Sequence, residues 1–323
     1  MNHRALIFFL LVIFALSSLL FSLMKGSTSV HFDQVLTAFF GQGNPLDQDI
    51  LWRLRLPRAW TAFVSGGLLA LAGALMQVLL RNPLADPYVL GISGGAALGA
   101  LLALFLGLSS LWLMGFAWAG ALGAIALTLL LVRGRIWHTT RLLLTGISLA
   151  CGFSALISFI LLLAPDRILH TLLFWLVGDL NETGLPVAAS VFLFLGLALA
   201  LRLAPALNIL ARGELDARAL GVPTRWVQGQ LYFLSSLLTA CAVSLSGCIG
   251  FIGLIAPHLL RLVLGYDHRL LLPASVLLGG SLLTLADVLA RTVAAPQQLP
   301  VGVVMTLLGV PVFLVVLARK QGV

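Results

Sequence analysis

Ionisable side chains are rare in this sequence, and Asp287 is the one whose position most strongly invites a chemical explanation. It lies in the apolar stretch LLTLADVLAR, where burial of a carboxylate is costly and marks a functional site by default. Arg291 follows four residues later, on the same face of a helix, and offers an ion pair. The spacing favours this structural pair over an isolated functional carboxylate.

The sequence lacks the motifs of ATP hydrolysis and of zinc chemistry. The phosphate-binding loop GxxxxGK[ST] is absent, and the only lysines are Lys25 and Lys320. His258 has no second histidine at metal-ligand spacing, because His268 lies ten residues further on. Three cysteines lie in apolar runs without the spacing of a metal site or disulfide framework: Cys151, Cys241 and Cys248. We therefore expect no enzyme activity, no catalytic residue, no metal and no cofactor on this chain.

Composition places most of the chain in lipid. Of its 323 residues 60% are hydrophobic and 9% charged, whereas soluble domains carry about 25% charged residues. The net charge of +8 comes from basic residues in short gaps between apolar runs, a pattern typical of membrane anchoring rather than nucleic-acid binding. The sequence predicts an all-α integral membrane protein, with one transmembrane domain over residues 1–323.

Ten apolar segments are candidates for membrane-spanning helices. The first is interpreted as a retained span rather than a signal peptide, because its apolar run is long and no clean cleavage site follows. The eighth is short, which suggests a tilted or broken helix shielded by protein. The segments are 5–24, 59–80, 88–108, 112–132, 142–164, 185–206, 227–246, 249–264, 270–291 and 300–318.

Polar segments interrupt this pattern in three places. Residues 25–58 form the first, and residues 164–184 predict a short helix at a membrane surface. Residues 208–226 show helical spacing interrupted by Gly213 and Gly221, which predicts two short helices outside the bilayer.

An even number of spans places both termini on the same side of the membrane. With that side inside, most basic residues are cytoplasmic, as the positive-inside rule requires. Six are then outside: Lys25, Arg53, Arg55, Arg58, Arg167 and Arg291. Three of these exceptions fall within WRLRLPR at 52–58, and such a cluster invites a functional explanation.

Long motifs carry a family resemblance from about Arg53 to the end of the chain. In chain order they are RLPR at 55–58, RNPLADPYVLGISGGA at 81–96, GELDARALGVP at 213–223, GFIGLIAPHLLR at 250–261, GYDHRLLLP at 265–273 and LPVGVVMTLLGVPVF at 299–313. In these motifs the chain resembles the FecCD-type permeases. Those are the membrane subunits of type II ABC importers for ferric siderophores, haem or vitamin B12.

The resemblance implies a type II ABC importer permease fold of ten helices and a homodimer with the transport path at its interface. It also implies two separate ATP-binding-cassette ATPase subunits, which hold ATP and Mg, and a periplasmic substrate-binding protein. The expected location is the bacterial inner membrane, with both termini cytoplasmic. The alternative is an ion-gradient-driven secondary transporter, which predicts more mid-span carboxylates than Asp287 alone.

The resemblance also assigns roles to individual residues at the two membrane faces. Segment 208–226 matches the cytoplasmic coupling loop, for which the alternative is an ordinary solvated loop. Its matched residues are Gly213, Glu214, Ala217, Leu220 and Gly221. Arginines matching the family's binding-protein contacts are Arg55, Arg58 and Arg291, since guanidinium groups suit carboxylate capture. The alternative for this group is interfacial anchoring of the second span.

A cytoplasmic gate is implied in the same way. Pro83 and Pro87 are expected to interrupt the helix there. The residues that match the gate are Asn82, Leu84, Thr139 and Thr140. The alternative is that Asn and Thr merely cap helix ends.

Overall fold

The computed structural model describes residues 3–26, 32–39, 41, 44–132, 139–181 and 184–320. Its regular structure in these ranges is helical, which confirms the predicted all-α fold. The apolar helices are α1 (His3–Met24), α4 (Leu56–Leu79), α5 (Ile92–Phe105), α6 (Ser110–Val132), α7 (Thr139–Leu163), α9 (Val187–Leu210), α11 (Thr224–Ser246), α12 (Ile252–Leu264), α13 (His268–Thr292) and α14 (Val301–Lys320). Shorter elements connect them: α2 (Phe32–Phe39), α3 (Pro45–Asp49), the π-helix η1 (Ile50–Arg55), the 3₁₀-helix η2 (Pro87–Leu90), α8 (Asp166–Val177) and α10 (Glu214–Ala219).

Each predicted apolar segment corresponds to one of the ten apolar helices. Within the described ranges, seven are long and apolar enough to cross a membrane, and α5, α12 and α14 are shorter apolar helices. Helix α12 has 13 residues and is therefore about 20 Å long, against a hydrocarbon core of about 30 Å. The prediction of a short eighth segment is confirmed.

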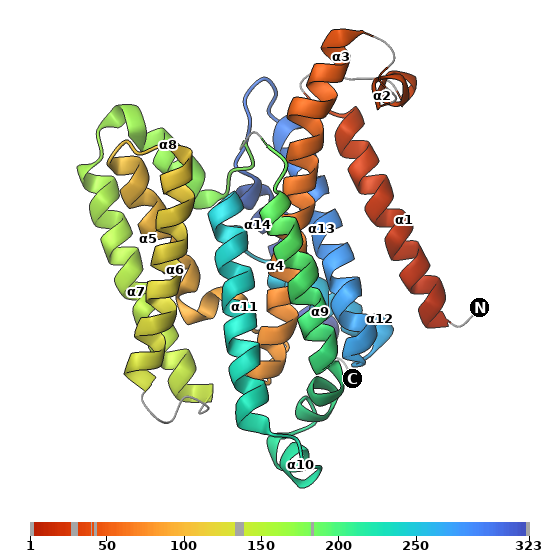
Figure 1. The fold of residues 1–323 in the computed structure, drawn as a ribbon, viewed down its shortest axis with the longest axis vertical. Helices are drawn as coiled ribbons and strands as arrows, with labels where there is room; N and C mark the ends of the chain where they lie inside the picture. The colour runs from red at the N-terminus through yellow and green to blue at the C-terminus, as the bar shows by residue number, and fades with distance from the viewer. Residues whose placement is uncertain are drawn as a thin grey trace.

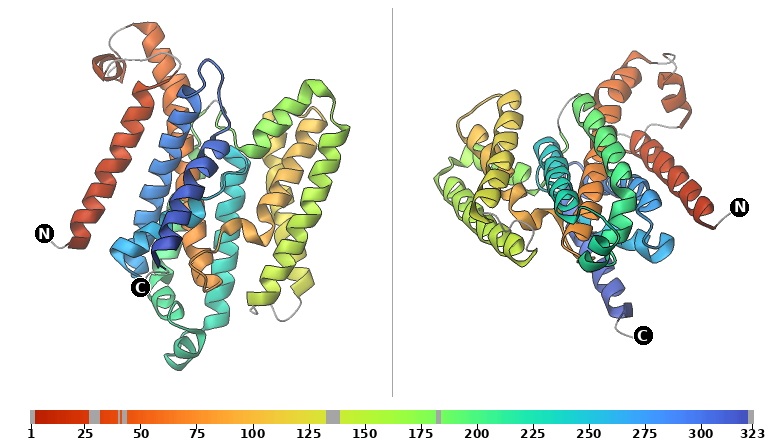
Figure 2. Two further views of the ribbon diagram at one scale, coloured as in Figure 1. Left: turned by 180° about the vertical axis from the view of Figure 1, so that it is seen from behind. Right: turned by 60° about the horizontal axis from the view of Figure 1, so that its bottom comes forward.

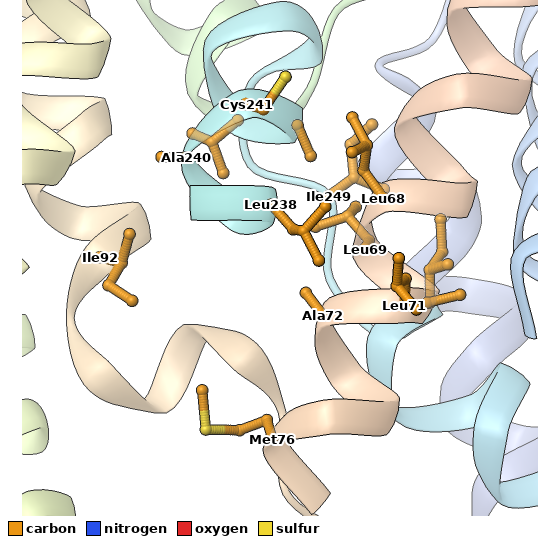
Figure 3. Close-up of a cluster of buried hydrophobic side chains, with 14 of the residues drawn as sticks. Leu68, Leu69, Leu71, Ala72, Met76, Ile92, Leu238, Ala240, Cys241 and Ile249 are labelled. Atoms are coloured by element: carbon orange, nitrogen blue, oxygen red, sulfur yellow. The ribbon is translucent and has the colours of Figure 1, made fainter. Parts of the chain in front are cut away.

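Helix α4 is the centre of the molecule, with α9, α11, α12 and α13 around it (Figure 1). Its side chains are buried without interruption from Thr61 to Leu79. Figure 3 shows part of this core, where leucines of α4 lie near Leu238 of α11 and near Ile249 in the connection to α12. A helix surrounded in this way has to be apolar on all sides, and the buried stretch of α4 contains no charged residue.

Glycine allows the neighbouring helices to approach α4 closely. A methyl group added at Gly66 would collide with the backbone carbonyl of Gly279 in α13. One added at Gly73 would collide with that of Gly253 in α12. Close approach through small residues is the usual way to pack helices in lipid, where apolar side chains gain little by leaving the solvent.

Helices α5, α6 and α7 form a smaller group beside this bundle (Figures 1 and 2). Glycine again sets the contact, because Gly95 and Gly99 of α5 lie against the backbone of Gly120 and Phe116 in α6. Helix α11 lies between the two groups and contacts α4, α5 and α6. The small group is therefore joined to the core through α11.

Regular helical hydrogen bonding is interrupted at two buried places, and side chains there bond the free backbone groups. The hydroxyl of Tyr88 donates to the carbonyl of Ile249 at 3.0 Å and accepts from its amide at 2.9 Å. In α12, Pro257 has no amide hydrogen for the carbonyl of Gly253. The Nε2 of Gln77 donates to that carbonyl at 3.4 Å and to that of Leu254 at 3.2 Å. These side chains supply the hydrogen bonds that irregular backbone needs at such depth.

The helices in the polar segments differ from those that the sequence predicted. The prediction of two short helices in 208–226 is wrong, because α9 continues to Leu210, α11 begins at Thr224, and only α10 lies between them. Segment 25–58 contains α2 and α3, and α3 continues through η1 into α4 as a 35-residue helical rod. The predicted short helix in 164–184 is confirmed as α8.

Candidate functional site

Helix α10 lies at one end of the bundle, here called the α10 end, and α3 lies at the opposite end, the α3 end (Figure 1). The start of α1 and the end of α14 both lie toward the α10 end. Two of the predicted residue sets lie at opposite ends. The predicted coupling-loop residues lie at the α10 end, and the three candidate docking arginines lie at the α3 end.

The α10 turn is fixed by its own backbone and by one buried methyl group. Gly221 has φ of 77°, a left-handed conformation that ends the helix. The amide of Val222 then donates to the carbonyl of Ala217 at 2.9 Å. The Ala217 side chain is fully buried, whereas the side chain of Leu220 is 69% exposed. The predicted coupling residues therefore hold the turn in place and present an apolar side chain outward.

Glu214 is the electrostatic centre of this end. Its carboxylate forms ion pairs with Arg81, just after α4, and with Arg218, one turn along α10. Partial burial raises the pKa of Glu214, but the two guanidinium groups outweigh burial and the net pKa is lowered. A cavity of about 430 Å³ lies between Arg81 and α10.

Arg81 takes part in the contacts of α10, which its place in the sequence did not predict. It directly precedes Asn82 and Leu84, two of the predicted gate residues, so its ion pair with Glu214 joins the gate loop to α10. Arg81 also has φ of 49°, an uncommon conformation for a residue with a side chain. The signal for it was its place at the start of the motif RNPLADP.

A second set of polar contacts fixes the far end of α9. Asn208 donates from Nδ2 to Asp267 at 2.9 Å and accepts from the amide of His268 at 2.8 Å. The hydrogen bond from Asn208 is the main reason that the pKa of Asp267 is lowered. Segment 208–226 is thus attached to the start of α13 at one end and to Arg81 near its middle.

The gate residues occupy two separate helix ends. The Oδ1 of Asn82 accepts from the amide of Leu84 at 2.9 Å, so Asn82 stabilises its own turn. Thr140 is exposed in the first turn of α7, and the side chain of Thr139 lies outside the described part of the structure. Segments α7 and η2 meet where Gly146 lies against the backbone of Leu90. The gate roles remain predictions, and the turn-stabilising role of Asn82 is observed.

At the α3 end, one buried carboxylate holds two arginines. Asp287 is fully buried and pairs with Arg291 at 3.0 Å, as the sequence predicted, and also with Arg58 at 2.9 Å. Arg58 further donates to Asn181 at 2.5 Å and to Gln298 at 3.0 Å. The second ion pair joins α4 to α13, and no sequence spacing could reveal it because its partners lie 229 residues apart.

The other two arginines at the α3 end bond the end of α1. Arg55 is only 6% exposed and donates to the carbonyls of Leu23 and Met24 at 2.7 and 3.1 Å. Arg291 donates to the Ser22 hydroxyl at 3.0 Å. In this conformation all three candidate docking arginines are engaged within the chain itself, and their docking role remains a prediction.

Comparison with known proteins agrees with this architecture. The model of the FecCD transport family matches residues 10–319. The chain belongs to the FecCD transport family. Among curated relatives, the vitamin B12 import system permease protein BtuC of Escherichia coli is 39% identical over 85% of this chain and 86% of its own length. An uncharacterised ABC transporter permease, YvrB of Bacillus subtilis, is 37% identical over 99% and 95%.

A solved structure extends the agreement to three dimensions. It is described as an inward-facing conformation of a metal-chelate type ABC transporter, with a TM-score of 0.87 and 32% identity over 97% of this chain and 99% of that one. This FecCD-family chain is therefore an ABC transporter permease, a multi-pass membrane protein with a transport role.

Proposed function

We propose that this FecCD-family permease imports a metal chelate, namely a ferric siderophore, haem or vitamin B12, by ATP-driven alternating access. ATP and Mg would bind to separate ATPase subunits at the α10 end, and a substrate-binding protein would dock at the α3 end. Two copies of the chain would form the transport path. The similarity to a vitamin B12 permease and to a metal-chelate transporter supports this substrate class.

The observation that carries the proposal is the ion pair between Glu214 and Arg81. It gives α10 a direct attachment to the loop that contains Asn82 and Leu84. Helix α10 also presents apolar side chains beyond the bundle, with Leu215 82% exposed, and such exposed side chains suit insertion into a soluble partner. A partner that shifts α10 as a rigid body would therefore move the gate loop with it.

Docking at the α3 end would use the charge excess around Asp287. Two guanidinium groups share this single carboxylate, so the cluster of Arg58, Arg291 and Asp287 keeps one net positive charge. Carboxylates of a binding protein would compete with Asn181 and Gln298 for Arg58, whose side chain is 15% exposed. Arg58 is therefore the best placed of the three arginines to begin docking.

The geometry of Asp287 argues against the alternative of a proton- or ion-coupled carrier. A carrier carboxylate must gain and lose a cation during each cycle. Asp287 is held by two arginines near the last turn of α13 and has no exposed surface. A carboxylate that two protein cations already occupy fits a structural anchor.

The proposal is tested by reconstituting the permease in liposomes with its ATPase and binding protein. Glu214→Gln should lower chelate uptake per ATP hydrolysed about tenfold, within the usual range of coupling free energies. Asp216→Asn is the matched control on the same helix, because the Asp216 carboxylate is exposed and makes no ion pair with a described residue; it should change uptake less than about twofold.

Two outcomes would contradict the proposal. Uptake driven by an ion gradient without the ATPase would rule out the ATP-driven mechanism. Equal, small effects of the two substitutions would rule out the role of Glu214 while leaving ATP-driven import intact.

A further inference from the structure

A groove between α9 and α11 has no part in the mechanism proposed above. Its volume is about 530 Å³, within the range of small-molecule sites in proteins. The two helices lie side by side, joined by α10 (Figure 1). Their lining residues recur at helical spacing, with Leu199 and Arg202 on α9 facing Trp226, Gln230, Phe233 and Leu237 on α11.

The groove has a polar end and an apolar end. Trp226 is the third residue of α11, close to the α10 end, and Leu237 lies 11 residues further on. The apolar wall is therefore about 16 Å long, comparable to one leaflet of a hydrocarbon core about 30 Å thick. Leu199 and Phe233 are about half exposed along it, so the groove opens to the surroundings of the bundle.

Arg202 gives the polar end its chemistry. In the described part of the chain no carboxylate or hydrogen-bond acceptor engages its guanidinium group. It lies about 12 Å before the end of α9 at Leu210, beside a tryptophan of the kind that marks the membrane–water interface. An unpaired cation at this depth favours an anion that reaches it from the interface.

Gln230 calls for a hydrogen-bond donor in the ligand as well. Its amide oxygen is buried in the groove region and has no hydrogen-bond partner among the described residues. A buried acceptor of this kind costs free energy until a donor reaches it. A headgroup with a phosphate for Arg202 and a hydroxyl for Gln230 would satisfy both side chains. A second copy of the apolar bundle would instead leave Arg202 buried without a counter-ion.

From these contacts we propose that the groove binds one anionic phospholipid with a hydroxylated headgroup, of the phosphatidylglycerol type. The phosphate lies on Arg202, the headgroup hydroxyl on Gln230, and one acyl chain along Leu199, Phe233 and Leu237. The site adjoins the segment that contains α10, so a bound lipid braces the two helices that carry the coupling loop.

Native mass spectrometry of the delipidated protein tests this directly. Phosphatidylglycerol and phosphatidylcholine with the same acyl chains are titrated separately, and the ratio of their dissociation constants is compared between variants. The unmodified chain should prefer phosphatidylglycerol, and Arg202→Gln should reduce that preference about fivefold, the effect of one basic residue on anionic lipid. Arg225→Gln removes the same charge at an exposed position outside the groove and should change the preference less than twofold.

Further variants keep the test independent of folding. Arg202→Lys keeps the cation and should keep most of the preference for phosphatidylglycerol. Leu234→Trp fills the groove and should weaken the binding of both lipids. Equal losses in Arg202→Gln and Arg225→Gln would overturn the site in favour of diffuse surface charge. Displacement of the lipid by inorganic phosphate alone would identify an anion site without lipid, and crosslinking of two chains across the groove would identify a second copy as its occupant. Binding is read without transport, so failure here leaves the proposed function standing.

Discussion

Replacing Asp287 by Asn would remove the one carboxylate that pairs with Arg58 and Arg291 among the residues that the structure describes. The substitution keeps the shape of the side chain and one oxygen that can accept a hydrogen bond. It removes the negative charge from a fully buried position with ion pairs of 2.9 and 3.0 Å. Two guanidinium groups with exposed fractions of 15% and 8% would then face each other without a counter-ion.

The expected cost follows from this burial. Removing one partner of a buried ion pair destabilises proteins by about 3–5 kcal/mol, because the remaining charge stays desolvated. Arg58 keeps Asn181 and Gln298, and Arg291 keeps Ser22, which limits the loss. We therefore expect a decrease of about 3 kcal/mol in the free energy of unfolding, at the lower end of that range.

Reversible unfolding in mixed micelles, followed by far-ultraviolet circular dichroism, measures this difference. The control is Arg53→Gln, which breaks the pair with Asp49 whose side chains are 79% and 66% exposed. Exposed pairs contribute about 0–1 kcal/mol, so the control should stay close to the unmodified protein. A loss below about 1 kcal/mol for Asp287→Asn, or one equal to the control, would refute the idea that this carboxylate anchors the α3 end.

Three further predictions concern the core and the α10 end. Gly73→Ala should lower the free energy of unfolding by about 3 kcal/mol, because the added methyl group would collide with backbone atoms of Gly253. Its control is Gly123→Ala, where the methyl group would meet open space, and this substitution should leave the free energy of unfolding unchanged or raise it. Tyr88→Phe removes the hydrogen bonds of the Tyr88 hydroxyl to the carbonyl and amide of Ile249 and should lower the free energy of unfolding by about 2–3 kcal/mol. A loss under about 0.5 kcal/mol, as expected for an exposed side chain, would contradict the bridging role of this hydroxyl. Because the folded-state pKa of Glu214 is lowered, its ion pairs should be intact at pH 6 and lost only as the pH falls through that lowered value, below the ordinary glutamate pKa of about 4.3. Hydrogen exchange in α10, corrected for intrinsic rates, should then rise, and a Glu214→Gln variant that shows the same step would exclude this carboxylate as the cause.

Hydropathy was enough to predict the helices, because each apolar segment must satisfy its own backbone hydrogen bonds in lipid. All ten segments correspond to apolar helices, including the short α12. Secondary structure was harder to predict in the segments that connect the apolar helices. The spacing of residues 208–226 suggested two helices, but α9 and α11 extend into this segment and leave room for α10 alone.

The pairing of Asp287 with Arg291 was predictable because both lie on one helix, four residues apart. Its pairing with Arg58, and that of Glu214 with Arg81, was not, because these partners lie on different elements and meet only when the helices pack. The sequence by itself determined the membrane class, the helices and the family motifs, since these depend on local composition and order. The tertiary structure alone decided which charges face one another, because in a bundle of similar apolar helices that choice depends on close contacts such as that of Gly73 with Gly253.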